Sequence, residues 1–524
     1  MFNNISIGGL SLIYTISGNL SINGYQIYGN YISQDCISLV ANNVFNSSVS
    51  IKHQVITANK FECGNMSSFV ISLMKYSNAT IYHVAISQYS NANILTNILS
   101  SSTKQLQLGG LVSLLDNSKI KLFDIQYIRS DTMNAQYIQY NGLIIGISFG
   151  NLCKIYITHI NINYCITLPR ASFTNQFGLI GSVDGQLQMH ECEYNLNISN
   201  GTFNYLGFIG QITALSTEAH IKNIEIQMIM NDSQGSRQST LVGNQCAQTW
   251  SLEKIQVSNS QLYGNNYIGY ICGYAQSSGT INEIIIDSSK ICIEATGHAY
   301  AGSIIGYIIN SKNTTIFGIQ ISGINISASS EQIDPHIGLI IGEQQINSNL
   351  TVVDSVTVNS NLQAIALFNT SYNGTMKSSY IGGFVGISYS NLVIQNSQQQ
   401  NISLNGSAQR NVFSGGVLGF SSSLANIQFS QIHLKWIFIN TNCKNIAFSG
   451  GIIGQAGNTV SISYVQIENY EISCFSSNST CKLTLNFVKP LIELNDSQSL
   501  GINIIDGITL SNCIFTDLEN QSGC

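Results

Sequence analysis

YIGGFVG, at Tyr380–Gly386, is the stretch of sequence that decides the fold, because the chain repeats it. An aromatic residue stands before a glycine pair, two apolar residues and a closing glycine. The same phrase returns as FSGGVLG (Phe413–Gly419), FSGGIIG (Phe448–Gly454), YAGSIIG (Tyr300–Gly306) and YLGFIG (Tyr205–Gly210). A phrase that recurs along the chain indicates a repeat architecture, in which each unit contacts only its neighbours.

The closing position of the phrase sets the period of the repeat. The gaps between closing positions run from 29 to 44 residues, and most lie near 33. These positions are Ser113, Gly146, Gly181, Gly210, Gly243, Gly273, Gly306, Gly342, Gly386, Gly419 and Gly454. A period near 33 also occurs in ankyrin and other two-helix repeats, so the pattern within each unit has to decide the fold.

Each unit contains two apolar-x-apolar steps separated by two residues. This pattern is found at Ile120, Leu122, Ile125 and Tyr127, at Ile155, Ile157, Ile160 and Ile162, at Leu187, Met189, Cys192 and Tyr194, at Ile427, Phe429, Ile432 and Leu434, and at Val460, Ile462, Val465 and Ile467. Alternation with a period of two indicates a strand with one buried face. The two-residue slip would turn one step outward in a flat strand, so it indicates a corner between two short strands.

The sequence therefore predicts an all-β fold, a right-handed, single-stranded parallel β-helix. We expect one domain of about 13 coils with roughly 33 residues per coil, stacked like the strands of a sheet. Residues 1–68 are expected to form irregular coils or a cap, residues 69–484 the regular repeats, and residues 485–524 the last coil and a C-terminal cap. The closing glycines are structural in this interpretation, because they either turn with a positive φ or let a neighbouring coil approach closely.

Composition excludes several classes of function. Charged residues make up only 9% of the chain and the formal net charge is −6, without a basic run, so we expect no nucleic acid partner. No apolar run of about 18 residues is present, so no membrane span is expected in this chain. Many Asn-x-Ser/Thr acceptors, such as Asn19, Asn78 and Asn401, favour a secreted or cell-surface glycoprotein.

The 13 cysteines show no Cys-x-x-Cys spacing, which weakens a zinc or redox interpretation. Cys474 and Cys481 flank a short polar loop, and Cys513 and Cys524 lie close together at the C-terminal end, so these two pairs are the disulfide candidates. The alternative is that the cysteines within strands are buried free thiols.

The glycine phrase, within coils rich in I-x-N-I and I-x-I steps, resembles the GLUG-motif repeat of large surface proteins. The match covers about residues 109–467. That resemblance implies a right-handed parallel β-helix in an adhesin-like, secreted or surface protein, where this chain would be a stalk or a binding rod. It implies no catalytic residues.

One column of side chains has the chemistry of a catalytic site. The second corner residue of each unit should stack along the outside, and the first three are Asp124, His159 and Glu191. Carboxylates on neighbouring coils can lie about 5–10 Å apart, which suits acid and base roles in glycan cleavage. The alternative is a solvated polar ridge. No hydrolase, metalloprotease, phosphate-loop or dinucleotide motif occurs, and no histidine pair has metal-ligand spacing, so we expect no metal and no cofactor.

The longest gap contains an insertion at residues 360–379, where Phe368, Tyr372 and Lys377 are candidates for a binding patch. The alternative is a glycosylated bulge. The sequence thus predicts a non-catalytic, adhesin-like scaffold that binds host or cell-surface proteins or glycans outside the cell. A β-helix polysaccharide hydrolase or lyase, and a passive spacer within a longer surface protein, are the alternatives.

Overall fold

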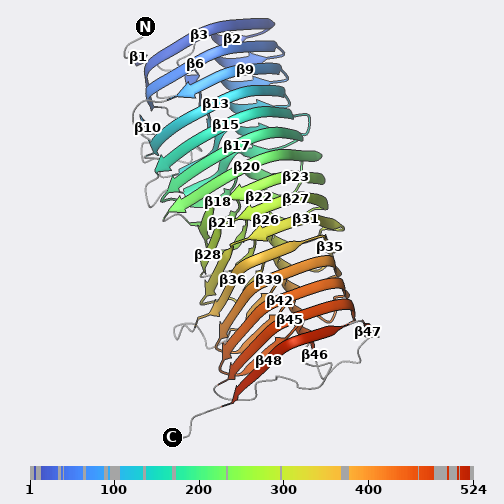
Figure 1. Cartoon of the computed structure of the whole chain (residues 1–524). Helices are drawn as coiled ribbons and strands as arrows, with labels where there is room; N and C mark the ends of the chain where they lie inside the picture. Colours follow the sequence, from blue (N-terminus) through green and yellow to red (C-terminus); the bar gives the residue numbers. More distant parts are fainter. Residues whose placement is uncertain are drawn as a thin grey trace. The chain divides into compact units, whose positions relative to one another are not determined.

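The computed structural model (Figure 1) describes residues 5–6 and 13–519, apart from residues 33–36, 39, 63–65, 88–91, 95–106, 134–136, 168–172, 232–233, 296–297, 368–376, 458, 477–491, 495–503 and 507. Every secondary-structure element formed by these residues is a β-strand, so the all-β prediction is confirmed. The chain forms two compact units, Met1–Gln256 and Val257–Cys524.

In the first unit the strands form two parallel β-sheets, which we call sheet A and sheet B. Sheet A contains β1 (Ile5–Ser6), β3 (Asn19–Ile32), β6 (Ser48–Glu62), β9 (Asn78–Ser87), β10 (Ala92–Ile94), β13 (Lys119–Met133), β15 (Lys154–Thr167), β17 (Gln186–Ser199), β20 (Glu218–Asn231) and β23 (Thr249–Ser258). Sheet B contains β2 (Ile13–Ile16), β4 (Ile37–Ser38), β5 (Ala41–Phe45), β7 (Met66–Ser68), β8 (Ile71–Lys75), β11 (Gln107–Gly109), β12 (Val112–Asp116), β14 (Tyr137–Phe149), β16 (Phe173–Val183), β18 (Thr202–Leu206), β19 (Ile209–Ile212), β21 (Gln234–Gln238) and β22 (Val242–Gln245).

The second unit repeats this arrangement. Its sheet A strands are β24 (Gln261–Gly264), β27 (Gly279–Asp287), β28 (Lys290–Ala295), β31 (Thr314–Ser322), β32 (Asn325–Ser330), β35 (Leu350–Val353), β36 (Val356–Ala366), β39 (Leu392–Ala408), β42 (Ile427–Cys443), β45 (Val460–Ser476), β47 (Ile504–Asp506) and β48 (Thr509–Glu519). Its sheet B strands are β25 (Tyr267–Gly269), β26 (Cys272–Ala275), β29 (Ala299–Gly302), β30 (Ile305–Ile308), β33 (Pro335–Gly338), β34 (Ile341–Gln344), β37 (Ser379–Gly382), β38 (Val385–Ser388), β40 (Asn411–Gly415), β41 (Leu418–Ser421), β43 (Ile446–Gly450), β44 (Ile453–Ala456) and β46 (Ile492–Leu494).

Equivalent residues of successive coils pair in register, as a parallel β-solenoid requires. Ile155 pairs with Leu187 in the first unit, and Ile427 pairs with Val460 in the second. Figure 1 shows β13, β15, β17 and β20 as neighbouring, nearly parallel ribbons. The regular solenoid has about 11 turns about 33 residues apart, slightly fewer than the 13 turns that the sequence led us to expect.

The core consists of the apolar columns that the sequence predicted. Ile120, Ile155 and Leu187 stack in register and are at most 1% exposed. The same parallel pairing continues into residues 1–68, where β3 pairs with β6 from Asn19↔Ser48 to Ile32↔Glu62.

The glycine phrase forms a tight bend between two short strands of sheet B. A Cβ atom on Gly306 would lie 2.6 Å from the backbone nitrogen of Ile268, in the preceding coil. The phrase glycines do not have positive φ angles, so of the two roles considered for them, close approach is the correct one. The leading aromatic rings stack between coils as expected, with Tyr380 and Phe413 at 4.7 Å and an interplanar angle of 4°.

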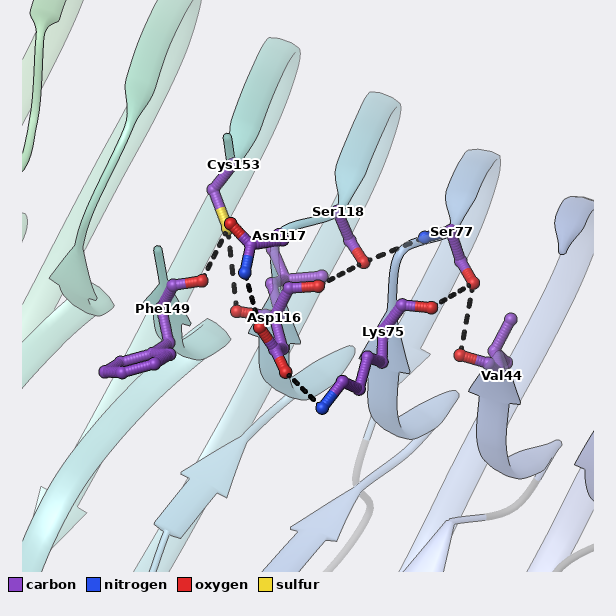
Figure 2. Close-up of polar contacts among 9 residues, drawn as sticks. Val44, Lys75, Ser77, Asp116, Asn117, Ser118, Phe149 and Cys153 are labelled. Atoms are coloured by element: carbon purple, nitrogen blue, oxygen red, sulfur yellow. Dashed lines mark hydrogen bonds and ion pairs between the residues drawn. The ribbon is translucent and has the colours of Figure 1, made fainter. Parts of the chain in front are cut away.

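A serine ladder connects the coils at another corner of the first unit (Figure 2). The backbone amide of Ser47 donates to Ser77 Oγ at 3.1 Å, and the amide of Ser77 donates to Ser118 Oγ at 3.1 Å. Ser77 Oγ in turn donates to the carbonyl oxygens of Lys75 and Val44. The residue before each serine, Asn46, Tyr76 or Asn117, has a positive φ. The hydroxyl groups therefore satisfy buried backbone groups where the chain turns.

The predicted insertion at residues 360–379 is shorter than we expected. Residues 360–366 belong to β36, which pairs in register with β32 and β39. Their side chains alternate between inward and outward positions, as in other coils, because the strand simply continues. The longer coil therefore departs from the repeat only after Ala366.

Candidate functional site

The corner residues of sheet A project from the solenoid in a left-handed backbone conformation. In the first unit they form a column that we call the corner ladder: His53, His83, Asp124, His159, Glu191, Asn223 and Lys254, all with φ between 49° and 56°. Asp124, His159 and Glu191 therefore lie at corners, as predicted, and His53 and His83 extend the column towards the N-terminus. The sequence also predicts Ser355 as the corner residue of its coil in the second unit, but the residue with the positive φ is Asp354, one position earlier.

Imidazoles and carboxylates of the corner ladder pair between adjacent coils. His83 Nδ1 lies 2.5 Å from Asp124 Oδ2, and His159 Nε2 lies 2.5 Å from Glu191 Oε2. These four side chains are 40% to 52% exposed. The ring of His83 also stacks on His53, with centroids 4.9 Å apart. The three candidate catalytic residues are thus brought together, on an exposed ridge.

A polar hollow of about 460 Å³ adjoins the C-terminal end of the ladder. Its lining contains three carboxylates, one ammonium group, one imidazole and two side-chain amides. The lining residues are His159, Glu191, Cys192, Glu193, Asn223, Ile224, Glu225, Lys254 and Gln256. Glu193 and Glu225 pair in register on neighbouring strands, and Asn161 Nδ2 donates to Glu193 Oε2. The hollow can therefore accept hydrogen bonds from hydroxyl or amine groups.

The pKa values of two groups near the hollow, Glu253 and Cys192, differ from the ordinary values of these side chains. The Lys222 ammonium donates to Glu253 Oε1 at 2.7 Å and holds the pKa of Glu253 below its ordinary value. Burial raises the pKa of the Cys192 thiol to about 12, so this sulfur is not a nucleophile near neutral pH. Within the described residues, no cluster of three or more histidine, cysteine, aspartate or glutamate side chains has metal-binding geometry.

Sequence reasoning missed a buried polar pair in sheet B of the second unit. His336 Nδ1 bonds to Glu343 Oε2, and the two residues are 5% and 1% exposed. His336 takes the place of the leading aromatic and stacks on Tyr300 with centroids 4.5 Å apart. The signal in the sequence was that PHIGLIIGE, residues 335–343, carries two ionisable groups where the two neighbouring coils carry aromatic or apolar residues.

Some of the remaining predicted site residues belong to the described part of the chain and others do not. Phe368 and Tyr372 lie outside the described residues, and Lys377 is half-buried with its carbonyl oxygen accepting the amide of Arg410. Cys474 is buried, Cys513 carries a free thiol, and Cys481 and Cys524 lie outside the described residues.

Comparison with known proteins matched no family model, no curated protein and no solved structure. In the part of the chain that the structure describes, no helix has the length and apolarity needed to cross a membrane.

Proposed function

We propose that this protein is a non-catalytic binding scaffold, secreted or displayed at a cell surface, which holds proteins or glycans against a long ridge of polar side chains. The observation that carries the proposal is the placement of the corner ladder. One polar or ionisable side chain per coil projects from the ridge. The paired imidazoles and carboxylates are 40% to 52% exposed. A regular, exposed row suits repeated polar contacts with an extended ligand.

The geometry favours binding over hydrolysis. Asp124 and Glu191 lie two coils apart, about 10 Å at the usual strand spacing, with His159 between them. Each carboxylate is engaged by an imidazole of the preceding coil. A glycosidase acid needs a desolvated environment that keeps it protonated, and a ridge open to water does not provide one.

The surface location rests on the acceptor asparagines and on the glycine phrase. Asn19, Asn46, Asn78, Asn313, Asn325, Asn349 and Asn401 begin Asn-x-Ser/Thr sequences and are exposed. Exposure is a requirement for N-linked glycosylation of a secreted protein. The resemblance of the phrase to GLUG repeats supports the same location.

The experiment measures binding and cleavage with the same preparation. Labelled full-length protein is added to intact cells, and separately to soluble neutral and acidic polysaccharides while new reducing ends are counted. The proposal predicts saturable cell binding without new reducing ends. Steady release of reducing ends that is lost in Glu191→Gln would support the hydrolase alternative, and the absence of any cell binding would support a passive spacer.

A further inference from the structure

Two exposed aromatic residues of the second unit occupy backbone positions that aromatic side chains avoid. Trp436 and Tyr464 both have φ 54° and are 43% and 64% exposed. A bulky residue with positive φ is strained, whereas asparagine adopts this conformation readily. Strain of this kind, retained in two exposed aromatic side chains on adjacent coils, indicates that the pair of rings is kept for contact with something outside the chain.

The coils on either side show what these corners would otherwise carry. The corner of Trp436 aligns with Asn359, Asn401, Asn469 and Asn512, all with positive φ. Asn401 Nδ2 donates to Asn359 Oδ1 at 2.9 Å, and Asn512 Nδ2 donates to Asn469 Oδ1 at 3.1 Å. Trp436 thus interrupts a hydrogen-bonded asparagine ladder that the local structure favours.

The corner of Tyr464 shows the same substitution in a neighbouring column. It aligns with Asn396 and Gln431, which have φ angles of 47° and 55°. Gln431 and Trp436 are two corners within β42, five residues apart, and Tyr464 lies beside Gln431 on the next coil. At the usual rise per residue and spacing of strands, the backbone positions of Trp436 and Tyr464 are roughly 17 Å apart.

Only polar side chains project from the short strands between the two rings. His433 pairs in register with Gln466, and Lys435 pairs with Glu468. Glu468 lies 3.5 Å from His433 Nε2 and 3.6 Å from Lys435 Nζ. These four side chains and the two rings form what we call the aromatic track: Trp436, Lys435, His433, Glu468, Gln466 and Tyr464.

We propose that the aromatic track binds a neutral oligosaccharide, with one sugar ring stacked on Trp436 and another on Tyr464. Sugar rings present an apolar C–H face that packs on aromatic rings, and their hydroxyl groups bond to amide, imidazole and charged side chains. The span of roughly 17 Å is longer than one sugar ring, which indicates an oligosaccharide.

The charge balance selects the class of glycan. The ammonium group of Lys435 also lies over the indole ring of Trp436, 5.5 Å from its centroid. Because Lys435 is opposed by Glu468, the track has no excess positive charge to attract sulfated or uronic acid chains. A protein partner would need a continuous apolar centre between the rings, and polar side chains occupy that place.

This inference rests on the proposed function and names the ligand of the scaffold. The test is binding of the full-length protein to an array of neutral and acidic oligosaccharides. Trp436→Asn and Tyr464→Asn install the residue that neighbouring corners carry, so both variants should fold, which thermal unfolding checks. Tyr76→Asn is the matched control, because Tyr76 has φ 48°, is 55% exposed and has a lysine 5.5 Å from its ring centroid.

We expect wild type to bind neutral oligosaccharides, each track variant to bind about ten-fold more weakly, and the control to bind as wild type does. Full binding by both track variants would overturn the site while leaving the scaffold function standing. Binding of wild type only to acidic glycans, or to no glycan, would overturn the ligand class. If the wild type also failed to bind cells, the scaffold function would be overturned.

Discussion

The backbone amide of Ser77 donates a hydrogen bond of 3.1 Å to the hydroxyl oxygen of Ser118, which belongs to the next coil. Both serines are 2% exposed, so neither the amide nor the hydroxyl has water as an alternative partner. This bond holds two coils together at a place where the chain turns and where the ladder of strand hydrogen bonds is interrupted.

Replacing Ser118 with alanine should therefore lower the free energy of unfolding by about 1–3 kcal/mol, because a buried amide loses its acceptor. Chemical denaturation of the full chain measures this change. The matched control is Ser21→Ala, on an outward position of β3, which should change stability by no more than about 0.5 kcal/mol. Equal effects of the two substitutions would contradict a structural role for the serine ladder.

The glycine phrase gives a prediction about close packing. Gly306→Ala places a methyl group 2.6 Å from the backbone of Ile268, so we expect a loss of about 3 kcal/mol or more. Gly323 is a control with the opposite expectation, because its φ of 64° is that of the corner asparagines and the nearest atom to an added Cβ lies at 3.5 Å. Gly323→Asn should leave the thermal midpoint nearly unchanged. A tolerated Gly306→Ala would show that the bend can open.

The buried His336–Glu343 pair predicts a rescue. Glu343→Ala leaves an unpaired imidazole among aromatic rings and should destabilise the protein by about 3–5 kcal/mol. The next coil carries Tyr380 and Ile387 in the same register. The double variant His336→Tyr with Glu343→Ile copies that coil and should restore wild-type stability or exceed it. A double variant as unstable as Glu343→Ala would indicate that the pair does more than fill this position.

His298 makes the stability of the second unit depend on pH. Burial lowers the pKa of His298 from its ordinary value of 6.5, against an opposing effect of Glu343. The unfolded chain therefore takes up this proton first as the pH falls, so stability is full above about pH 6.5 and declines below it. His298→Phe should show a smaller decline of unfolding free energy between about pH 7 and pH 5. Identical pH profiles would contradict the assignment.

Much of the fold could be predicted from the sequence because the determining signals are local. The two-residue slip between apolar steps located the corners, and Ile120, Leu122, Ile125 and Tyr127 are all at most 2% exposed. The displacement by one residue at Asp354 has a physical reason. Ser355 is fully buried and its amide bonds to Ser397 Oγ, so the residue before the serine makes the turn. In the coils with Asp354 and Asn396, the signal for this corner is an aspartate or asparagine followed by serine.

Other features depend on contacts that are distant in the sequence. Because of the glycine bend, the leading aromatic residue lies next to the residue seven positions later in the sequence. The ring centroids of Tyr300 and Tyr307, for example, are 5.6 Å apart. No local pattern gives the angle of that bend. The pairing of Trp436 with Tyr464 likewise required the φ angles and the alignment of coils, because the two residues are far apart in the sequence.

Tryptophan fluorescence tests the central claim most directly, because the chain has only two tryptophans. Trp250 is 3% exposed and Trp436 is 43% exposed, so a ligand stacked on the track changes the emission of Trp436 alone. Titration with the neutral oligosaccharide that binds best on the array should give a saturable change in emission in the wild type and no change in Trp436→Asn. The same saturable change in Trp436→Asn, or none in the wild type, would contradict the account.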